Sequence, residues 1–234
     1  RQAIGLKDGD ICVLQATRIV PRKGIELAID VVHALNEPYR RSILQERGLY
    51  NGRKFTSKNK IVLVLAGYDH DDPTGKYLGK LLSKAKNLNV DLRHIDNFIG
   101  RERRVINGQK IFALWDTYVI ADLVTYPSLW EGWGNQLLEA IRAKLPIVIF
   151  EYPVYLQDIK NRDFDVISLG SKISGKDQGG LVQISDDVIQ RTADQCVVYL
   201  TNRAIRKDSV DKNFLIGKKY YSFDALKNIL KRWF

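Results

Sequence analysis

The sequence predicts an α/β fold in which a doubly wound parallel sheet is covered by helices on both faces. Short runs rich in Val, Ile and Leu alternate along the chain with longer segments of helical period. Strands of such a sheet are buried on both faces, and a helix usually joins one strand to the next. The segments expected to form strands are 11–16, 61–66, 90–95 and 121–127.

Segments of helical period lie between and after these strands. Helices are expected at 24–35, 74–85, 108–120, 137–143, 186–201 and, with an amphipathic pattern, 211–234. The polar stretch 36–59 is expected to be a helix end and an exposed loop, and the Gly-rich stretch 171–183 a mobile loop. Asp-Pro chemistry favours a turn at 68–73 over a cation site. Trp115 and Tyr118 are expected to pack in the core.

Composition indicates a globular protein with an anionic partner. The 234 residues are 45% hydrophobic, and 37 Lys and Arg against 27 Asp and Glu give a net charge of +10. A basic balance favours a nucleotide, a nucleic acid or a membrane surface as partner. Clusters such as 101–104 are nevertheless expected to be mainly solvated surface. No apolar run reaches the ~18 residues that suggest a membrane span.

Cysteine and histidine usage argues against disulfide and metal chemistry. Cys12 and Cys196 lie in apolar surroundings and are expected to be buried free thiols, as in a reducing cytoplasm. The histidines, His33, His70 and His94, are scattered along the chain. No metal-ligand cluster is therefore expected.

The most informative segment is the Gly-rich turn that separates Glu131 from Glu139. It follows the expected strand 121–127 and leads into the expected helix 137–143. Unpaired backbone N–H groups and the positive end of a helix dipole meet at such a junction, and both favour an anion. The pattern therefore suggests a site that binds a phosphorylated ligand and holds hydroxyl groups on either side of the phosphates.

Two other roles for these carboxylates fit less well. Glycoside hydrolysis needs carboxyl groups about 5–9.5 Å apart, whereas eight positions across a turn and a helix put the backbones of Glu131 and Glu139 about 12 Å apart. The alternative is that Glu131 caps the helix and Glu139 is a solvated helix residue. Gly132 and Gly134 between them, and the strand before them, favour ligand binding.

Residues 127–140 read Pro-Ser-Leu-Trp-Glu-Gly-Trp-Gly-Asn-Gln-Leu-Leu-Glu-Ala. This segment resembles the E-x7-E motif of retaining glycosyltransferases of the group-1 (family-4) type, which have the GT-B fold. Trp133 stands where that family usually has Phe, and 146–149 is similar to its following strand. Residues 17–24 are similar to its G-R-x4-K-G motif, with Thr17 in place of Gly. The resemblance covers about residues 5–150 and fades afterwards.

The resemblance implies a Rossmann-like sheet, one half of a GT-B enzyme, and it assigns site residues. Arg18 and Lys23 would hold the donor diphosphate, since Arg forks onto phosphate oxygens and Lys adds a mobile point charge. Glu131 would contact the donor sugar and, with Arg18 and Lys23, makes up the expected catalytic set. Glu139 would hold the ribose hydroxyls. The remaining expected donor-binding residues are Gly67, Gly100, Arg101, Gly132, Trp133 and Gly134.

The implied activity is transfer of a sugar from a UDP-, GDP- or ADP-linked donor to an acceptor hydroxyl, with retention and without a metal or other cofactor. Because the chain starts at Arg1 without a methionine, where the family's second domain begins, we expect an isolated donor-binding domain. An acceptor sugar, lipid or small molecule would bind a missing N-terminal domain. Residues 1–210 are expected to form the donor domain and 211–234 a helix that crosses back to the missing one.

Two other functions remain to be weighed. A non-catalytic basic module for nucleotides or nucleic acid is the alternative, but the basic residues are not interleaved with aromatics in a strand platform, so no nucleic-acid partner is expected. An oxidoreductase would need G-x-G-x-x-G after the first strand, which is missing. The expected location is the cytoplasm. The basic, aromatic segment 211–234 leaves peripheral contact with the inner membrane face open.

Overall fold

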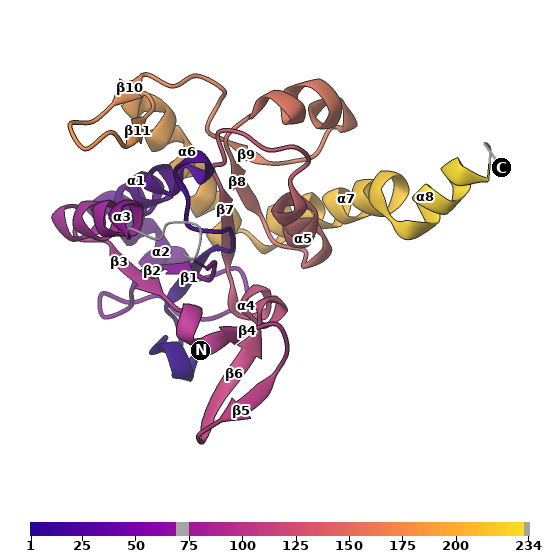
Figure 1. Cartoon of the computed structure of the whole chain (residues 1–234). Helices are drawn as coiled ribbons and strands as arrows, with labels where there is room; N and C mark the ends of the chain where they lie inside the picture. Colours follow the sequence, from indigo (N-terminus) through magenta and orange to yellow (C-terminus); the bar gives the residue numbers. More distant parts are fainter. Residues whose placement is uncertain (69–74, 232–234) are drawn as a thin grey trace.

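A central sheet of parallel strands runs through the molecule (Figure 1). The structure, a computed structural model, describes residues 1–68 and 75–231. The strand order is β3-β2-β1-β7-β8-β9, and every neighbouring pair is parallel, which confirms the predicted α/β fold. The bounds are β1 Ile11–Gln15, β2 Ile61–Leu65, β3 Asp91–His94, β7 Leu123–Tyr126, β8 Ile147–Ile149 and β9 Ile167–Ser168.

Helices cover both faces of this sheet, and this explains why β2 is apolar at every position and fully buried. Side chains of β1 alternate between two hydrophobic clusters, with Ile11 and Val13 in one and Cys12 and Leu14 in the other. The first face is covered by α1 Ile25–Leu35, α3 Lys76–Asn87 and α6 Asp186–Thr201. The second face is covered by α4 Leu114–Ile120, α5 Asn135–Arg142 and α7 Arg203–Tyr221.

The polar stretch 36–59 contains a whole helix, α2 Pro38–Arg47, so the prediction of a helix end and a loop was wrong. Pro38 suits the first turn of a helix, where its missing N–H costs nothing. The buried residues of α2 are only Arg40 and Leu44, which left its sequence pattern mostly polar. The buried Arg40 guanidinium donates to Asp194 Oδ1 at 2.8 Å and thereby ties α2 to α6.

Where a helix was predicted over 108–120, the structure has the second strand of a hairpin followed by the short helix α4. Strands β5 Arg104–Ile106 and β6 Gln109–Ala113 are antiparallel, and β6 also pairs with β4 Ile99–Gly100. Asn107 and Gly108 form the turn, with φ values of 49° and 80°. An Asn-Gly pair between two strands is a strong hairpin signal. Trp115, predicted to be core, is 44% exposed, whereas Tyr118 is buried as predicted.

The C-terminal third differs from the prediction in two places. The stretch 171–183 holds an antiparallel pair of strands, β10 Gly175–Lys176 and β11 Val182–Gln183. The final helical segment begins at Arg203, the start of α7, instead of residue 211, and α8 Phe223–Leu230 follows it away from the sheet (Figure 1). The short helices are η1 Gln2–Ile4, η2 Pro21–Lys23, η3 Asp96–Phe98, η4 Tyr155–Ile159 and η5 Lys160–Arg162. Apart from Tyr68, the turn predicted at 68–73 lies outside the described residues.

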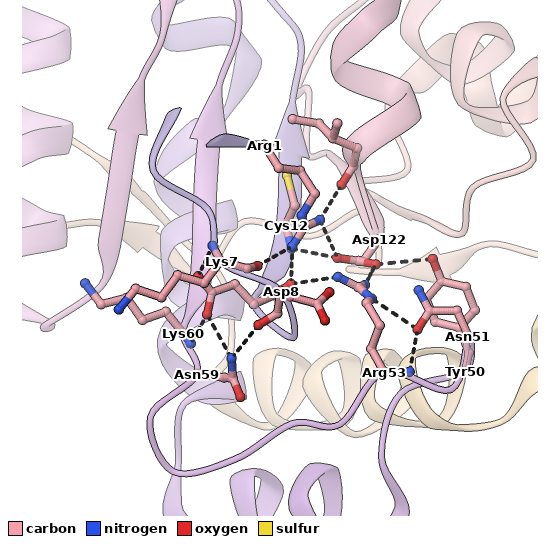
Figure 2. Close-up of polar contacts among 12 residues, drawn as sticks. Arg1, Lys7, Asp8, Cys12, Tyr50, Asn51, Arg53, Asn59, Lys60 and Asp122 are labelled. Carbon is pink, nitrogen blue, oxygen red and sulfur yellow. Dashed lines mark hydrogen bonds and ion pairs between the residues drawn. The ribbon is translucent and has the colours of Figure 1, made fainter. Parts of the chain in front are cut away.

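A buried carboxylate, Asp122, organises the amino ends of the strands (Figure 2). Its Oδ2 accepts the backbone N–H of Cys12 at 2.9 Å, and its Oδ1 accepts from Tyr50 and Arg53. The guanidinium of Arg206, on α7, donates to the Asp122 carbonyl at 2.8 Å. This network therefore joins β1, β7, the segment after α2 and α7 at the edge opposite to the candidate site.

The predicted state of the two cysteines can be compared directly with the structure. Cys12 and Cys196 are buried free thiols, as predicted, and burial raises the pKa of Cys12 to about 12. None of the helices within the described ranges combines the length and apolar character needed to span a bilayer.

Gly67 lies just after β2, against the loop that follows β1. A Cβ at this position would overlap the carbonyl oxygen of Thr17 and lie 2.9 Å from the backbone nitrogen of Arg18. Only glycine allows the two loops to approach so closely. The loop that carries Arg18 therefore has its position set by its neighbour.

We expect Gly67→Ala to lower the free energy of unfolding by about 2–3 kcal/mol, because the backbone of Thr17 must move to admit the methyl group. Gly79→Ala is the matched control. Gly79 lies in α3 with open space around its Cα, so alanine there should raise stability by about 0.5–1 kcal/mol. Urea unfolding of both variants measures the difference. If Gly67→Ala were as stable as the wild type, the backbone of Thr17 would move at little cost, which would contradict this account of the two loops.

Candidate functional site

A cleft of about 360 Å³ lies at the carboxyl edge of the sheet, between the segments that follow β1 and β7. Ligands of open α/β sheets bind at this edge. The predicted residues that line it together are Arg18, Lys23, Glu131, Trp133, Gly134 and Glu139. The structure thus brings both sequence motifs into one site.

Glu131 joins the two motifs through ion pairs. Its Oε1 accepts a hydrogen bond from Lys23 Nζ, and its Oε2 accepts from Arg22 at 3.1 Å. Lys23 and Glu131 are only 8% and 7% exposed. Lys23 is therefore held by an ion pair in this structure, and its role as a mobile point charge towards phosphate stays a prediction. Glu131 bonds to these cations, and Gly134 is the N-cap of α5, so Glu131 does not cap the helix.

The environment shifts the pKa values of both partners downwards. Burial lowers the pKa of Lys23, although its hydrogen bond and attraction to Glu131 oppose the shift. Burial alone would raise the pKa of Glu131, but the hydrogen bond from Lys23 and the charges of Lys23 and Arg22 lower it overall. The carboxylate is therefore ionised at neutral pH and presents charge to the cleft.

The amino end of α5 forms the floor next to this ion pair. Gly134 has φ 103°, and a Cβ there would collide with the hydroxyl groups of Tyr152 and Tyr126. Tyr152 donates to the Trp133 carbonyl at 3.0 Å, which fixes the turn before the helix. No side chain caps α5 among the described residues. Its first N–H groups thus stand at the cleft as an anion-binding end.

Two polar side chains of α5 line the far side of the cleft. Glu139 Oε2 accepts a hydrogen bond from the Tyr118 hydroxyl at 2.6 Å, so its orientation is set by the second core cluster. Gln136 is 5% exposed, and its Oε1 has no hydrogen-bond partner among the described residues. A buried acceptor without a partner is costly unless a ligand donor reaches it.

The other predicted residues lie around this cleft. Gly67 sets the position of the loop before Arg18, as described above. Gly132 is exposed on the turn between Glu131 and Trp133, and it is not part of the lining. Gly100 and Arg101 line a separate hollow of about 560 Å³ with Tyr68 and Arg104. They are therefore not brought together with the Glu131 cleft in one pocket.

Sequence reasoning missed several residues of the site. The missed residues are Arg22, Tyr118, Tyr126, Gln136 and Tyr152. Arg22 lies inside the recognised motif, and its position next to Lys23 was the available signal. The tyrosines lie on β7, α4 and the segment after β8, where the sequence suggested core packing. Their roles depend on contacts between distant segments.

Metal ligands do not gather in the part of the chain that the structure describes. Within residues 1–68 and 75–231, no three His, Cys, Asp or Glu side chains form a group that could hold a metal ion. The cationic groups at the cleft are Arg18, Arg22 and Lys23.

We expect Glu131→Gln to lower the free energy of unfolding at pH 7 by about 3 kcal/mol, because Lys23 is left buried without its counter-ion. The pKa of Glu131 is lower in the folded than in the unfolded chain. Between these two values the unfolded chain binds more protons, so the contribution of the pair is lost as the pH falls below about 4. Urea unfolding measured between pH 7 and pH 3 should show the difference in free energy of unfolding between the wild type and Glu131→Gln falling towards zero.

The control for this series is Glu46→Gln, on the exposed side of α2. It should unfold like the wild type at each pH, since surface charges contribute little. A wild-type advantage over Glu131→Gln that stayed constant down to pH 3 would contradict an ionised, paired Glu131.

Comparison with known proteins places this geometry in a family. The family model described as "Glycosyl transferases group 1" matches residues 1–168. A mannosylglucosylglycerate synthase of Thermotoga maritima is 35% identical over 232 residues, which cover 99% of this chain and 50% of that protein. A synthase of the same name from Petrotoga mobilis is 37% identical over 211 residues, covering 86% and 47%. The chain spans about half the length of the curated relatives it matches.

Solved structures of low sequence identity share the fold. A glycosyltransferase from Rickettsia africae has a TM-score of 0.61 at 13% identity, covering 97% of this chain and 48% of that one. The C-terminal domain of LpcC, a group 1 glycosyl transferase of Francisella tularensis, has a TM-score of 0.57 at 14% identity, covering 95% and 91%. The fold is that of one half of a GT-B enzyme. With the family model covering most of its length, this chain belongs to the group 1 glycosyl transferases.

Proposed function

We propose that this chain is the donor-binding half of a retaining glycosyltransferase, which moves a sugar from a nucleotide-diphosphate donor to an acceptor hydroxyl. The observation that carries the proposal is the arrangement of the cleft. Arg18, Arg22 and Lys23 line one cleft together with the open amino end of α5 and the carboxylates of Glu131 and Glu139. Cations and helix N–H groups suit a diphosphate, and carboxylates suit hydroxyl groups.

The diphosphate is the leaving group, so the transition state gains negative charge on its oxygens. Preorganised cations and backbone dipoles stabilise such charge at little reorganisation cost. Lys23 is already held by Glu131, and Arg18 lies exposed at the rim of the cleft. We propose that these cations take the place of a divalent metal, so that the enzyme needs no cofactor.

The two carboxylates bind the two ends of the donor. Glu139, oriented by Tyr118, accepts hydrogen bonds from the ribose hydroxyls. The Gln136 Oε1, which has no hydrogen-bond partner within residues 1–68 and 75–231, accepts from a further ligand donor. Glu131, beside Lys23, contacts the transferred sugar. The base would extend towards Gly100 and Arg101 in the neighbouring hollow. Whether the base is uracil, guanine or adenine is for the binding experiment to decide.

The names of the curated relatives suggest the product. Mannosylglucosylglycerate synthases are 35% and 37% identical to this chain. We propose that the enzyme containing this chain adds a mannosyl group to glucosylglycerate, with an N-terminal half supplying most of the acceptor site. The helices α7 and α8 would cross back to that half, because Phe223 and Leu226 are 90% and 51% exposed on α8. Residues 1–210 as donor domain and a cytoplasmic location stay predictions.

We expect Arg18→Ala to weaken binding of the matching nucleoside diphosphate about tenfold, because a charge-assisted contact to phosphate is lost. Binding of the nucleoside alone should not change. Glu139→Ala should weaken binding of both the nucleoside diphosphate and the nucleoside, and it should leave binding of inorganic pyrophosphate unchanged. Calorimetric titration of this chain with UDP, GDP, ADP and their nucleosides, with and without EDTA, measures these affinities.

Arg47→Ala, an exposed arginine on α2, is the matched charge control. The proposal fails if no nucleoside diphosphate binds more tightly than its nucleoside, or if Arg18→Ala weakens both ligands equally. Retention is tested separately on the enzyme that carries this chain. NMR of the first-formed product should show the donor's anomeric configuration, and the opposite configuration would exclude a retaining enzyme.

A further inference from the structure

A second hollow lies next to the donor cleft at the same edge of the sheet. Its volume is about 510 Å³, and Arg22 lines both this hollow and the donor cleft. Its walls come from the start of α1, the first turns of α3 and the β10–β11 hairpin. We call it the Lys80 pocket. Because Arg22 bonds to Glu131, the pocket begins one arginine side chain away from the expected position of the transferred sugar.

The Lys80 pocket is strongly basic. Its lining contains Arg22, Lys76, Lys80 and Lys176, against the single acid Glu26. Lys80 and Lys176 are exposed, and neither has an ion-pair partner among the described residues. Like charges gathered in a hollow repel one another and raise the local concentration of anions. The pocket therefore favours a small anionic group over a neutral one.

Glu26 forms no ion pair with Lys80 or Lys176 in the described part of the chain, and its oxygens accept hydrogen bonds from other groups. It is 2% exposed, accepts a hydrogen bond from the Tyr77 hydroxyl, and accepts the backbone N–H of Val182 at 2.8 Å. These bonds fasten the β10–β11 hairpin to α1 and α3. They hold Lys176, on the hairpin, over the same hollow as Lys80, on α3. The arrangement of the two lysines is thus built into the fold.

We infer that the Lys80 pocket binds the carboxylate of the acceptor. This inference rests on the proposed function, in which the acceptor is glucosylglycerate, a sugar that carries a carboxylate on its glycerate unit. The accepting hydroxyl of the glucose ring must lie next to the transferred donor sugar, near Glu131. From there the glycerate unit extends past Arg22 into the basic hollow. Apolar side chains of Leu129, Leu181 and Val182 form part of the lining against which the glycerate carbons pack.

Acceptor recognition is then shared between the two halves of the enzyme. The N-terminal half positions the sugar ring, and this half selects for the negative charge. A neutral acceptor of the same shape, glucosylglycerol, has CH2OH in place of the carboxylate and gains nothing from Lys80 and Lys176. The difference between the two acceptors isolates the charge interaction, as specificity is a difference of affinities.

Steady-state kinetics on the enzyme that carries this chain, with glucosylglycerate and glucosylglycerol as acceptors, provide the test. For the double variant Lys80→Ala/Lys176→Ala we expect kcat/KM for glucosylglycerate to fall about tenfold or more, mainly through KM. The values for glucosylglycerol and for the nucleotide sugar should stay unchanged. Added salt should raise KM for glucosylglycerate in the wild type and have little effect in the double variant.

The matched control is Lys86→Ala/Lys172→Ala, which removes the same charge from α3 and from the segment before the hairpin, outside the pocket lining. It should behave like the wild type. An equal loss for both acceptors, or no loss for either, would overturn the pocket while leaving the proposed function intact. Absence of transfer to glucosylglycerate by a wild-type enzyme that binds its nucleotide would overturn both.

Discussion

The ion pair between Lys23 and Glu131 is the interaction on which the site depends. It joins residues 108 positions apart, one after β1 and the other after β7, and these strands are neighbours in the sheet. Both side chains are more than nine-tenths buried, so water solvates their charges only from the cleft and each charge depends mainly on the other. The pair therefore fixes the relative position of the two loops before any ligand arrives, and a preorganised site costs less to occupy.

The surroundings of this pair follow from the same geometry. Gly67 lets the loop after β2 press against Thr17, and Gly134 lets Tyr126 and Tyr152 reach the turn before α5. Arg22 bonds to Glu131 from the other side and separates the donor cleft from the Lys80 pocket. Arg22 thus lines two basic hollows, which suits the proposed reaction between a diphosphate donor and an anionic acceptor.

The sheet could be predicted from the sequence because its two central apolar runs, 11–14 and 61–65, are unbroken by polar residues. The helix α2 could not, since it buries little besides Arg40 and Leu44. The Asn107-Gly108 turn was a readable signal that the helical pattern around it obscured. At the site, the motifs gave Arg18, Lys23, Glu131 and Glu139. The contacts of Tyr118 and Tyr152 could not be predicted, because they join segments that only the fold brings together.

The most direct measurement is a nucleoside diphosphate titration of this chain followed by amide NMR. We expect the largest shifts in the loop 16–24 and at the amino end of α5, around residues 131–136, with smaller shifts near Gly100. Such a result would place the diphosphate beside the Lys23–Glu131 pair. Shifts confined to the β5–β6 hairpin or to α7 and α8, with residues 16–24 unperturbed, would contradict a donor site organised by that ion pair.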